Sequence, residues 1–194
     1  MNNLSRLLVW MRRLSYCRGF GVQSPSAYRF IRYVVNEHYP YYAYARLRRE
    51  FPHVGWRKRK LAELYFRVAN FAQASTWIDF AASDKVVEAY VTSGCRATSL
   101  HNVVQTDDFE ACGTPQVVRA TACKGCREFV LGMAARAGHD TIMIVEDIGR
   151  SRMAAEAWQA LLASGHTSVS FDLYYCGIAF FDTERARHDY IVNF

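Results

Sequence analysis

The chain of 194 residues has a mass of 22.3 kDa, 51% hydrophobic and 22% charged residues, and a net charge of +6. These values are typical of one ordinary globular domain, with or without an extension, and they exclude a wholly disordered, collagen-like or coiled-coil chain. No apolar run approaches the roughly 18 residues of a membrane-spanning helix, and the N-terminus lacks the pattern of a secretory signal. We therefore expect a cytoplasmic protein without a membrane span.

The net charge is divided unevenly along the chain. Residues 1–70 hold 14 Lys and Arg against three Glu, which gives +11, whereas residues 71–194 carry −5. The division predicts a basic helical extension over residues 1–72 and an α/β domain over residues 73–194. The basic part could contact nucleic acid, an anionic membrane or the acidic remainder of the chain. We favour packing on the remainder, with weak nucleic-acid contact as an open alternative.

The first third of the chain shows the apolar spacing of helices. Leu4 to Leu14 form one apolar face, which we expect to be buried. Ser24 and Pro25 read as the start of a second helix. A basic run at 57–60 leads into a third, with its apolar stripe over residues 61–69. The aromatic segment 39–44 is interpreted as packing, with stacking on bases as the alternative.

From residue 75 onward, strand patterns alternate with helix patterns. This alternation predicts a mostly parallel sheet with helices on both faces, and the closing strands, which lack a crossover helix, predict an antiparallel C-terminal edge. Helices are expected after a cap at Ser83 or Asp84, over 124–137, and from a cap at Ser151 to Gly165. The expected strands cover residues 76–80, 97–104, 116–120, 141–145, 167–175, 177–182 and 189–193.

Six cysteines are present, and without a signal sequence we expect free thiols. Cys123 and Cys126 form a lone CxxC, whereas a structural zinc site needs four ligands. We interpret the pair as two small residues that open a helix and predict no metal site.

Ligands of open α/β sheets bind beyond the carboxyl ends of the strands. Polar residues follow several predicted strands here: Asp79, His101, Thr121 and the pair Glu146-Asp147. Each also has a purely structural interpretation. Asp79 could be a strand-end cap or ion-pair partner, His101 a polar loop residue, and the acidic pair a cap for the following helix.

Several segments resemble the class I S-adenosylmethionine-dependent methyltransferases, in particular a bacterial subgroup with a helical N-terminal extension. The resemblance is carried by residues 19–25 (GFGVQSP), 39–44 (YPYYAY), 60–70, 145–148 (VEDI) and 171–181. It implies a Rossmann-like methyltransferase fold with S-adenosylmethionine as the cofactor. The resemblance further implies a set of site residues: Asp79, Ala81, Ser83 and His101 at the cofactor, Glu146 and Asp147 in catalysis, and Gln23, Ser24 and Thr121 in the crevice.

The chain departs from that family where the cofactor should sit. Ala81 and Lys85 occupy positions where the family has glycine, which lets the backbone approach the cofactor. His101 replaces an acidic residue and Gln23 a histidine, residues 121–124 replace an Asp-Gly-Asn-His element, and one βα unit is expected to be missing between residues 95 and 121.

We therefore expect a methyltransferase-like protein with impaired or lost cofactor binding, acting as a binding or interaction module. An active methyltransferase with an atypical cofactor loop is one alternative. A nucleic-acid-binding protein that uses the basic N-terminal third is the other.

Overall fold

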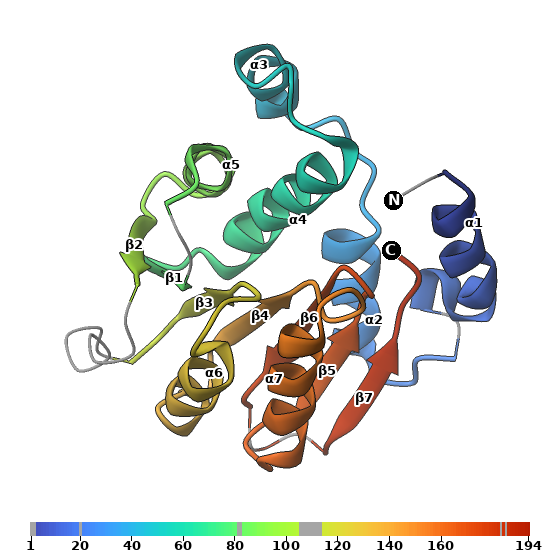
Figure 1. The fold of residues 1–194 in the computed structure, drawn as a ribbon, viewed down its shortest axis with the longest axis vertical. Coiled ribbons are helices and arrows are strands. Elements are labelled where there is room, and N and C mark those ends of the chain that lie inside the picture. Colours follow the sequence, from blue (N-terminus) through green and yellow to red (C-terminus); the bar gives the residue numbers. More distant parts are fainter. Residues whose placement is uncertain (1–2, 20, 81–82, 105–113, 183, 185) are drawn as a thin grey trace.

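A computed structural model describes residues 3–19, 21–80, 83–104, 114–182, 184 and 186–194. Its N-terminal part is helical and its remainder alternates strands with helices (Figure 1). The helical part comprises α1 (Asn3–Arg12), the 3₁₀-helix η1 (Leu14–Gly19), α2 (Pro25–Phe30), the π-helix η2 (Ile31–Val35), α3 (Tyr42–Glu50) and α4 (Trp56–Ala72). The remainder comprises β1 (Thr76–Phe80), α5 (Lys85–Gly94), β2 (Ser99–Val103), β3 (Val117–Ala120), α6 (Cys126–Ala135), β4 (Ile142–Glu146), α7 (Arg152–Ala163), β5 (Val169–Asp172), β6 (Cys176–Phe180) and β7 (His188–Ile191).

The strands form one seven-stranded sheet in the order β2-β1-β3-β4-β6-β5-β7. The prediction of a mostly parallel sheet is confirmed, because β6 is antiparallel to both its neighbours and every other described pair is parallel. The antiparallel pairing predicted for the closing strands is present in β5 and β6, but it does not form the edge of the sheet. A tight turn at Leu173–Tyr175, with Tyr174 at φ 68°, folds β6 back between β4 and β5, and the edge strand β7 runs parallel to β5. The same turn makes β5 shorter than predicted.

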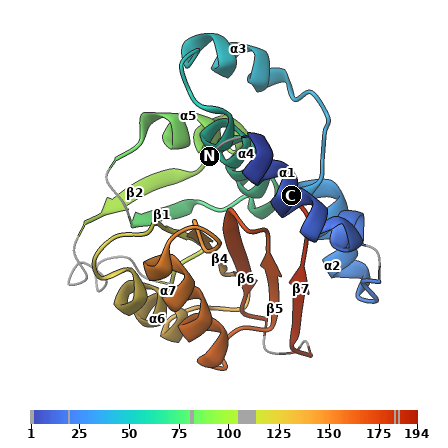
Figure 2. The same cartoon turned by 45° about the vertical axis from the view of Figure 1, so that its right-hand side comes forward.

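Helices cover both faces of the sheet, as Figure 2 shows. Alternating strand residues divide the core into two clusters. On one face, Trp77, Val117 and Ile144 pack with residues of α2, η2 and α4. On the other face, Ile78, Val118 and Val145 pack with residues of α6 and α7. One apolar cluster therefore joins the N-terminal helices to the strands.

Local capping chemistry places several helix starts as predicted. Ser24 and Ser151 accept hydrogen bonds from the amides three residues on, and Asp84 accepts from the amides of Val86 and Val87. Helix α4 begins at Trp56, so the basic run forms its first turns instead of preceding it.

Helix α1 differs from its expectation in packing. Its apolar side chains were expected to be buried, yet Leu7, Met11 and Leu14 are each about half exposed. Polar contacts hold this segment instead: Arg13 donates to Asp172 and to the Val192 carbonyl, and Asn193 donates to the Trp10 carbonyl. Within the described residues, no helix combines the length and the apolar character needed to cross a membrane.

One βα unit was expected to be missing between residues 95 and 121, a stretch that the structure describes only in part. Strands β2 and β3 both pair with β1, and residues 105–113, which lie between them in the chain, are outside the described residues.

Candidate functional site

Strand β1 lies between β2 and β3, so the sheet order reverses there. In open α/β sheets, this reversal marks the crevice where ligands bind, at the carboxyl ends of the strands. Asp79 on β1 is in register with Arg119 on β3. Arg119 is in turn in register with Ile144 on β4, and Glu146 lies two residues further along that strand. Because side chains alternate along a strand, Asp79, Arg119 and Glu146 lie on one face, under α4.

Arg119 connects the two carboxylates. Its Nη1 donates to both oxygens of Asp79, at 2.6 and 2.7 Å. Its Nε and Nη2 donate to Oε2 of Glu146, at 3.0 and 2.8 Å. The side chains of Arg119 and Asp79 are 4% and 1% exposed, so this charged network belongs to the protein interior.

Tyr65 of α4 closes the network from above. Its hydroxyl donates to Oε2 of Glu146 at 2.8 Å, and its ring lies 5.2 Å from the Arg119 guanidinium carbon. A cation over an aromatic face is stabilised by the ring quadrupole, more strongly where water is excluded. The sheet edge and the N-terminal helices are thus joined by polar as well as apolar contacts.

Burial and charge act in opposite directions on these groups. Burial raises the pKa of Asp79, and the Arg119 guanidinium opposes the rise. Burial lowers the pKa of Arg119, but Tyr65, Glu146 and Asp79 outweigh it, so that pKa is raised and the cation is favoured. Burial, then Glu146, raises the pKa of Tyr65 well above its ordinary value, so its hydroxyl remains a donor.

Two further ion pairs lie at the rim. Arg57 Nη1 is 2.6 Å from Oδ1 of Asp147, and Lys58 Nζ is 2.8 Å from Oδ2 of Asp84. Asp147 has φ 62°, a left-handed conformation that is uncommon for residues other than glycine. The basic first turn of α4 therefore binds the acidic ends of β4 and α5.

Little space remains between these side chains. The cavity lined by Arg57, Tyr65, Asp84, Arg119 and Glu146 has a volume of about 70 Å³. Pockets for ligands of cofactor size usually hold about 300–1,000 Å³. The cavity that these side chains line is therefore smaller than a pocket for a ligand of cofactor size.

The predicted site residues are brought together only in part. Thr121 lies beside the network, where its amide and hydroxyl both donate to the Phe80 carbonyl at 3.2 Å. Ser83 is exposed next to the cap Asp84. Ala81 lies outside the described residues. Asp79, Thr121, Glu146 and Asp147 thus share one edge of the sheet.

The remaining candidates lie elsewhere. His101 lies within β2, inside the expected strand 97–104 and not beyond its end as a crevice residue would be, and it is exposed opposite Ile78. Ser24 is occupied as the cap of α2, and Gln23 is exposed beside it. The following residues Ser26 and Ala27 line a cavity of about 750 Å³ with Ile142, at the amino end of the strands.

Sequence reasoning missed the central residue of the network. Arg119 is the one charged residue within the apolar strand Val117–Ala120, and a buried charge requires a partner. A charged residue within an otherwise apolar strand was therefore the sequence feature that could have identified Arg119 as part of a buried ion pair. Tyr65 was predicted only as a core residue, and the basic run 57–60 only as a charge cluster.

Other reactive side chains lie away from the network. The ligand atoms of His139, Asp182 and Glu184 lie within 4.8 Å of one another, a spacing that could hold a metal ion, although only Asp182 is buried.

Cys95, Cys123, Cys126 and Cys176 are free thiols, as predicted, whereas the side chains of Cys17 and Cys112 are not described. Burial raises the pKa of Cys126 to about 11, which disfavours a reactive thiolate.

In comparisons with known proteins, no protein-family model and no curated protein matches the chain.

Proposed function

We propose that this protein is a methyltransferase-like α/β protein that has lost cofactor binding and acts as a binding or interaction module. The observation that carries the proposal is the Asp79–Arg119–Glu146 network at the switch point of the sheet. The mostly parallel sheet and the helical N-terminal part are compatible with the sequence resemblance to the methyltransferases.

The energy of the network supports this assignment. A cofactor at the switch point would have to displace the Arg119 side chain, which makes four hydrogen bonds to two carboxylates. Separation of one partner from a buried ion pair costs about 3–5 kcal/mol. That cost would lower cofactor affinity by about 10²- to 10⁴-fold relative to an open crevice.

The nucleic-acid alternative has less support, because the basic run is engaged within the chain. Arg57 and Lys58 form the ion pairs at the rim, and Arg59 donates to the carbonyls of Phe51 and Pro52. Lys60 Nζ lies 4.2 Å from the centroid of the Phe194 ring. These contacts favour a role of the run in packing.

Calorimetric titration with S-adenosylmethionine, together with thermal unfolding, tests the proposal. We expect no binding heat and no shift of the unfolding temperature at millimolar cofactor. A ligand at 100 times its Kd would stabilise the protein by about 2.7 kcal/mol, so a shift of several degrees would contradict the proposal.

A pair of variants tests the cause. We expect Arg119→Ala to bind the cofactor more tightly than the wild type if the arginine is the obstacle. Arg127→Ala, which removes an exposed arginine from α6, is the matched control and should leave binding unchanged. Because Arg119→Ala could unfold, the wild-type titration alone decides whether the cofactor binds.

A further inference from the structure

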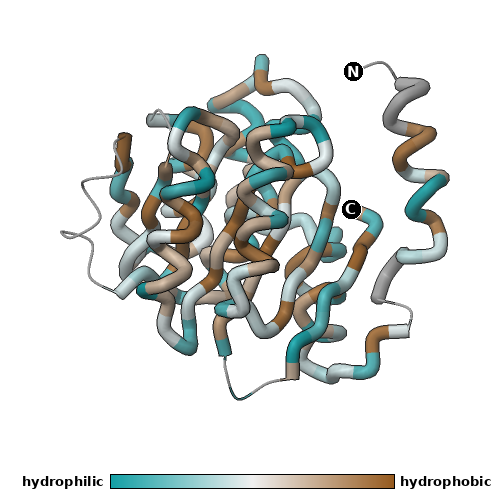
Figure 3. Tube along the Cα trace, turned by 60° about the horizontal axis from the view of Figure 1, so that its bottom comes forward, coloured by the Kyte–Doolittle hydropathy of each residue, from teal (hydrophilic) through white to brown (hydrophobic). Residues whose placement is uncertain are grey.

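The N-terminal segment carries apolar side chains that the described residues leave about half exposed. Leu7 and Met11 lie one turn apart on α1, Leu14 follows at the start of η1, and each is 50–51% exposed. Leu8 and Trp10 are 43% and 49% exposed. In Figures 1 and 3, α1 lies at the margin of the molecule, beside the C-terminal end of the chain.

Polar contacts attach this segment to the rest of the chain. Arg13 Nη2 donates to Oδ1 of Asp172 at 2.7 Å, and the amide of Asn193 donates to the Tyr16 carbonyl at 3.1 Å. These contacts tie the end of α1 and the start of η1 to the C-terminal strand region. The helix is therefore attached to the body while its apolar side chains remain exposed.

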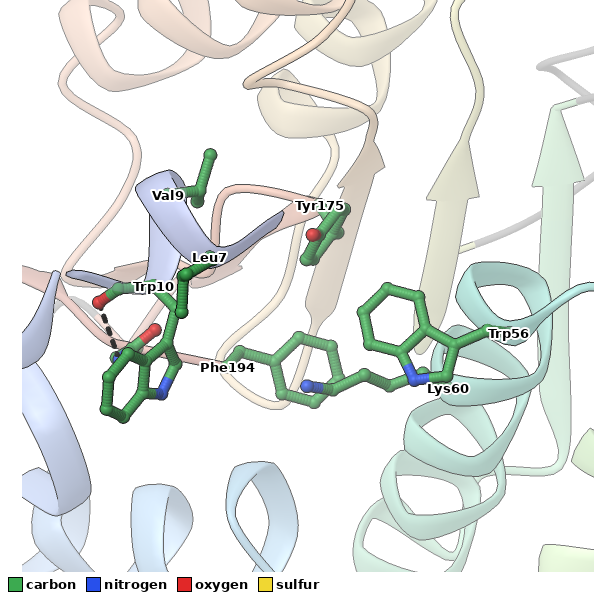
Figure 4. Close-up of a pocket in the computed structure, with 8 residues that line it drawn as sticks. Leu7, Val9, Trp10, Trp56, Lys60, Tyr175 and Phe194 are labelled. Atoms are coloured by element: carbon green, nitrogen blue, oxygen red, sulfur yellow. Dashed lines mark hydrogen bonds between the residues drawn. The ribbon is translucent and has the colours of Figure 1, made fainter. Parts of the chain in front are cut away.

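A groove beside α1 extends the same apolar surface. It has a volume of about 460 Å³ and lies between Leu7 and Trp10 on one side and Trp56 and Lys60 of α4 on the other, with Phe194 between them (Figure 4). Tryptophan is enriched where proteins meet the polar and apolar zones of a bilayer. Lysine there keeps its ammonium group at the headgroup level while its stem covers apolar surface.

The first 36 residues of the chain are basic. Residues 1–36 contain six arginines and no Asp or Glu. Arg12, Arg29 and Arg32 are exposed, and none of them has an ion-pair partner among the residues that the structure describes. An apolar helical face with arginines beside it is the pattern of a helix that lies flat in the interface of an anionic bilayer.

We propose that α1 and the start of η1 form an interfacial anchor that binds the surface of an anionic phospholipid bilayer. The apolar face from Leu7 to Leu14 would enter the headgroup region. Arg12, and Arg32, which lines a cavity with Trp10, would meet the lipid phosphates. A second copy of the chain would bring another Arg12 and another Arg32 to the same place, so the charge of the segment favours an anionic bilayer over a second copy. The proposal goes beyond the function proposed above and does not depend on it, since neither α1 nor η1 contributes to the network at the switch point.

Vesicle co-sedimentation tests this anchor. The full chain is mixed with vesicles of phosphatidylcholine alone, or of phosphatidylcholine and phosphatidylglycerol in equal amounts. We expect binding to the mixed vesicles at least tenfold stronger than to the neutral ones, and weaker at about 0.5 M than at about 0.1 M salt, because salt screens the charges.

Matched variants locate the contact. The double variant Leu7→Glu/Met11→Glu should lose vesicle binding, whereas the control Met153→Glu/Ile191→Glu, at residues 48% and 45% exposed on other elements, should retain it. The double variant Arg12→Gln/Arg32→Gln should bind about thirtyfold more weakly, since each arginine near an anionic surface contributes about fivefold. Thermal unfolding of each variant confirms that it is folded.

Four results would overturn the proposal. The first two are no binding to the mixed vesicles and equal binding to both kinds of vesicle. The third is loss of binding in the control variant as well. The fourth is a dimer, detected by light scattering, that the variant Leu7→Glu/Met11→Glu dissociates. Salt-sensitive binding of duplex DNA without vesicle binding would overturn it in favour of nucleic acid. Cofactor titration reports on the switch point alone, so either proposal can fail while the other stands.

Discussion

The hydroxyl of Tyr65, on the fourth helix, donates a hydrogen bond of 2.8 Å to Oε2 of Glu146, at the end of the fourth strand. Both Arg119 donors that reach Glu146 bind this same oxygen. One oxygen of the partly buried Glu146 carboxylate thus links α4 to two neighbouring strands. The contact explains why a basic helical segment and a net acidic α/β segment share one interior.

Removal of this hydroxyl should destabilise the protein. We expect Tyr65→Phe to lower the free energy of unfolding by about 1.5–3 kcal/mol, the usual contribution of a hydrogen bond to a charged group. The matched control is Tyr33→Phe, at a tyrosine that is 60% exposed, with an expected change within about 0.5 kcal/mol. Urea unfolding measures both, and equal values for the two variants would contradict a role for the hydroxyl.

The cap of α5 should give the protein a pH-dependent contribution. Burial raises the pKa of Asp84, but Lys58 and the amides of Val86 and Val87 outweigh it, so that pKa lies below its ordinary 3.8 in the folded state. A carboxyl group whose pKa is lower in the folded than in the unfolded state stabilises the protein at pH values above its unfolded pKa. This stabilisation is lost as the pH falls from about 3.8 through the lower pKa of the folded state.

The variant Asp84→Ala should therefore cost about 0.5–2 kcal/mol near neutral pH, as losses of helix caps do. The difference from the wild type should shrink as the pH is lowered below 3.8. Ser83→Ala changes the exposed neighbour and should have little effect at any pH. Denaturant unfolding at several pH values provides the measurement, and a cost for Asp84→Ala that does not change with pH would argue against the charge of the cap.

Local patterns predicted the elements better than the site. The strand 76–80 and the caps at Ser24 and Ser151 could be derived from the sequence, because each depends on a few adjacent residues. The interpretation of Asp79 as an ion-pair partner is confirmed, but its partner was not identified. Arg119 is 40 residues away in the chain and becomes a neighbour only through the order of the strands.

The exposure of α1 could not be predicted for a different reason. An apolar stripe such as Leu7, Met11 and Leu14 shows that a helix has one apolar face, and it does not show what covers that face. Helix α4 carries a similar stripe, which is buried against the sheet. The two helices differ in their neighbours in the fold. The residues of a helix do not by themselves show which elements will pack against it.

The close approach of α4 and α5 leads to a further prediction. A Cβ atom on Gly94, in α5, would overlap the backbone carbonyl of Phe66, in α4, and no flexible side chain could move aside to accommodate it. The variant Gly94→Ala must therefore separate the two helices, and we expect it to lower the free energy of unfolding by about 1–3 kcal/mol.

Helix propensity alone gives the opposite sign for this variant. In an open helical site, alanine is more favourable than glycine by about 1 kcal/mol. Gly55, which has no atoms within 4 Å of an added Cβ and precedes α4 as its cap, is the control, and Gly55→Ala should cost less than about 1 kcal/mol. Thermal and urea unfolding compare the two variants. A Gly94→Ala protein more stable than the wild type would show that α4 and α5 do not pack this closely.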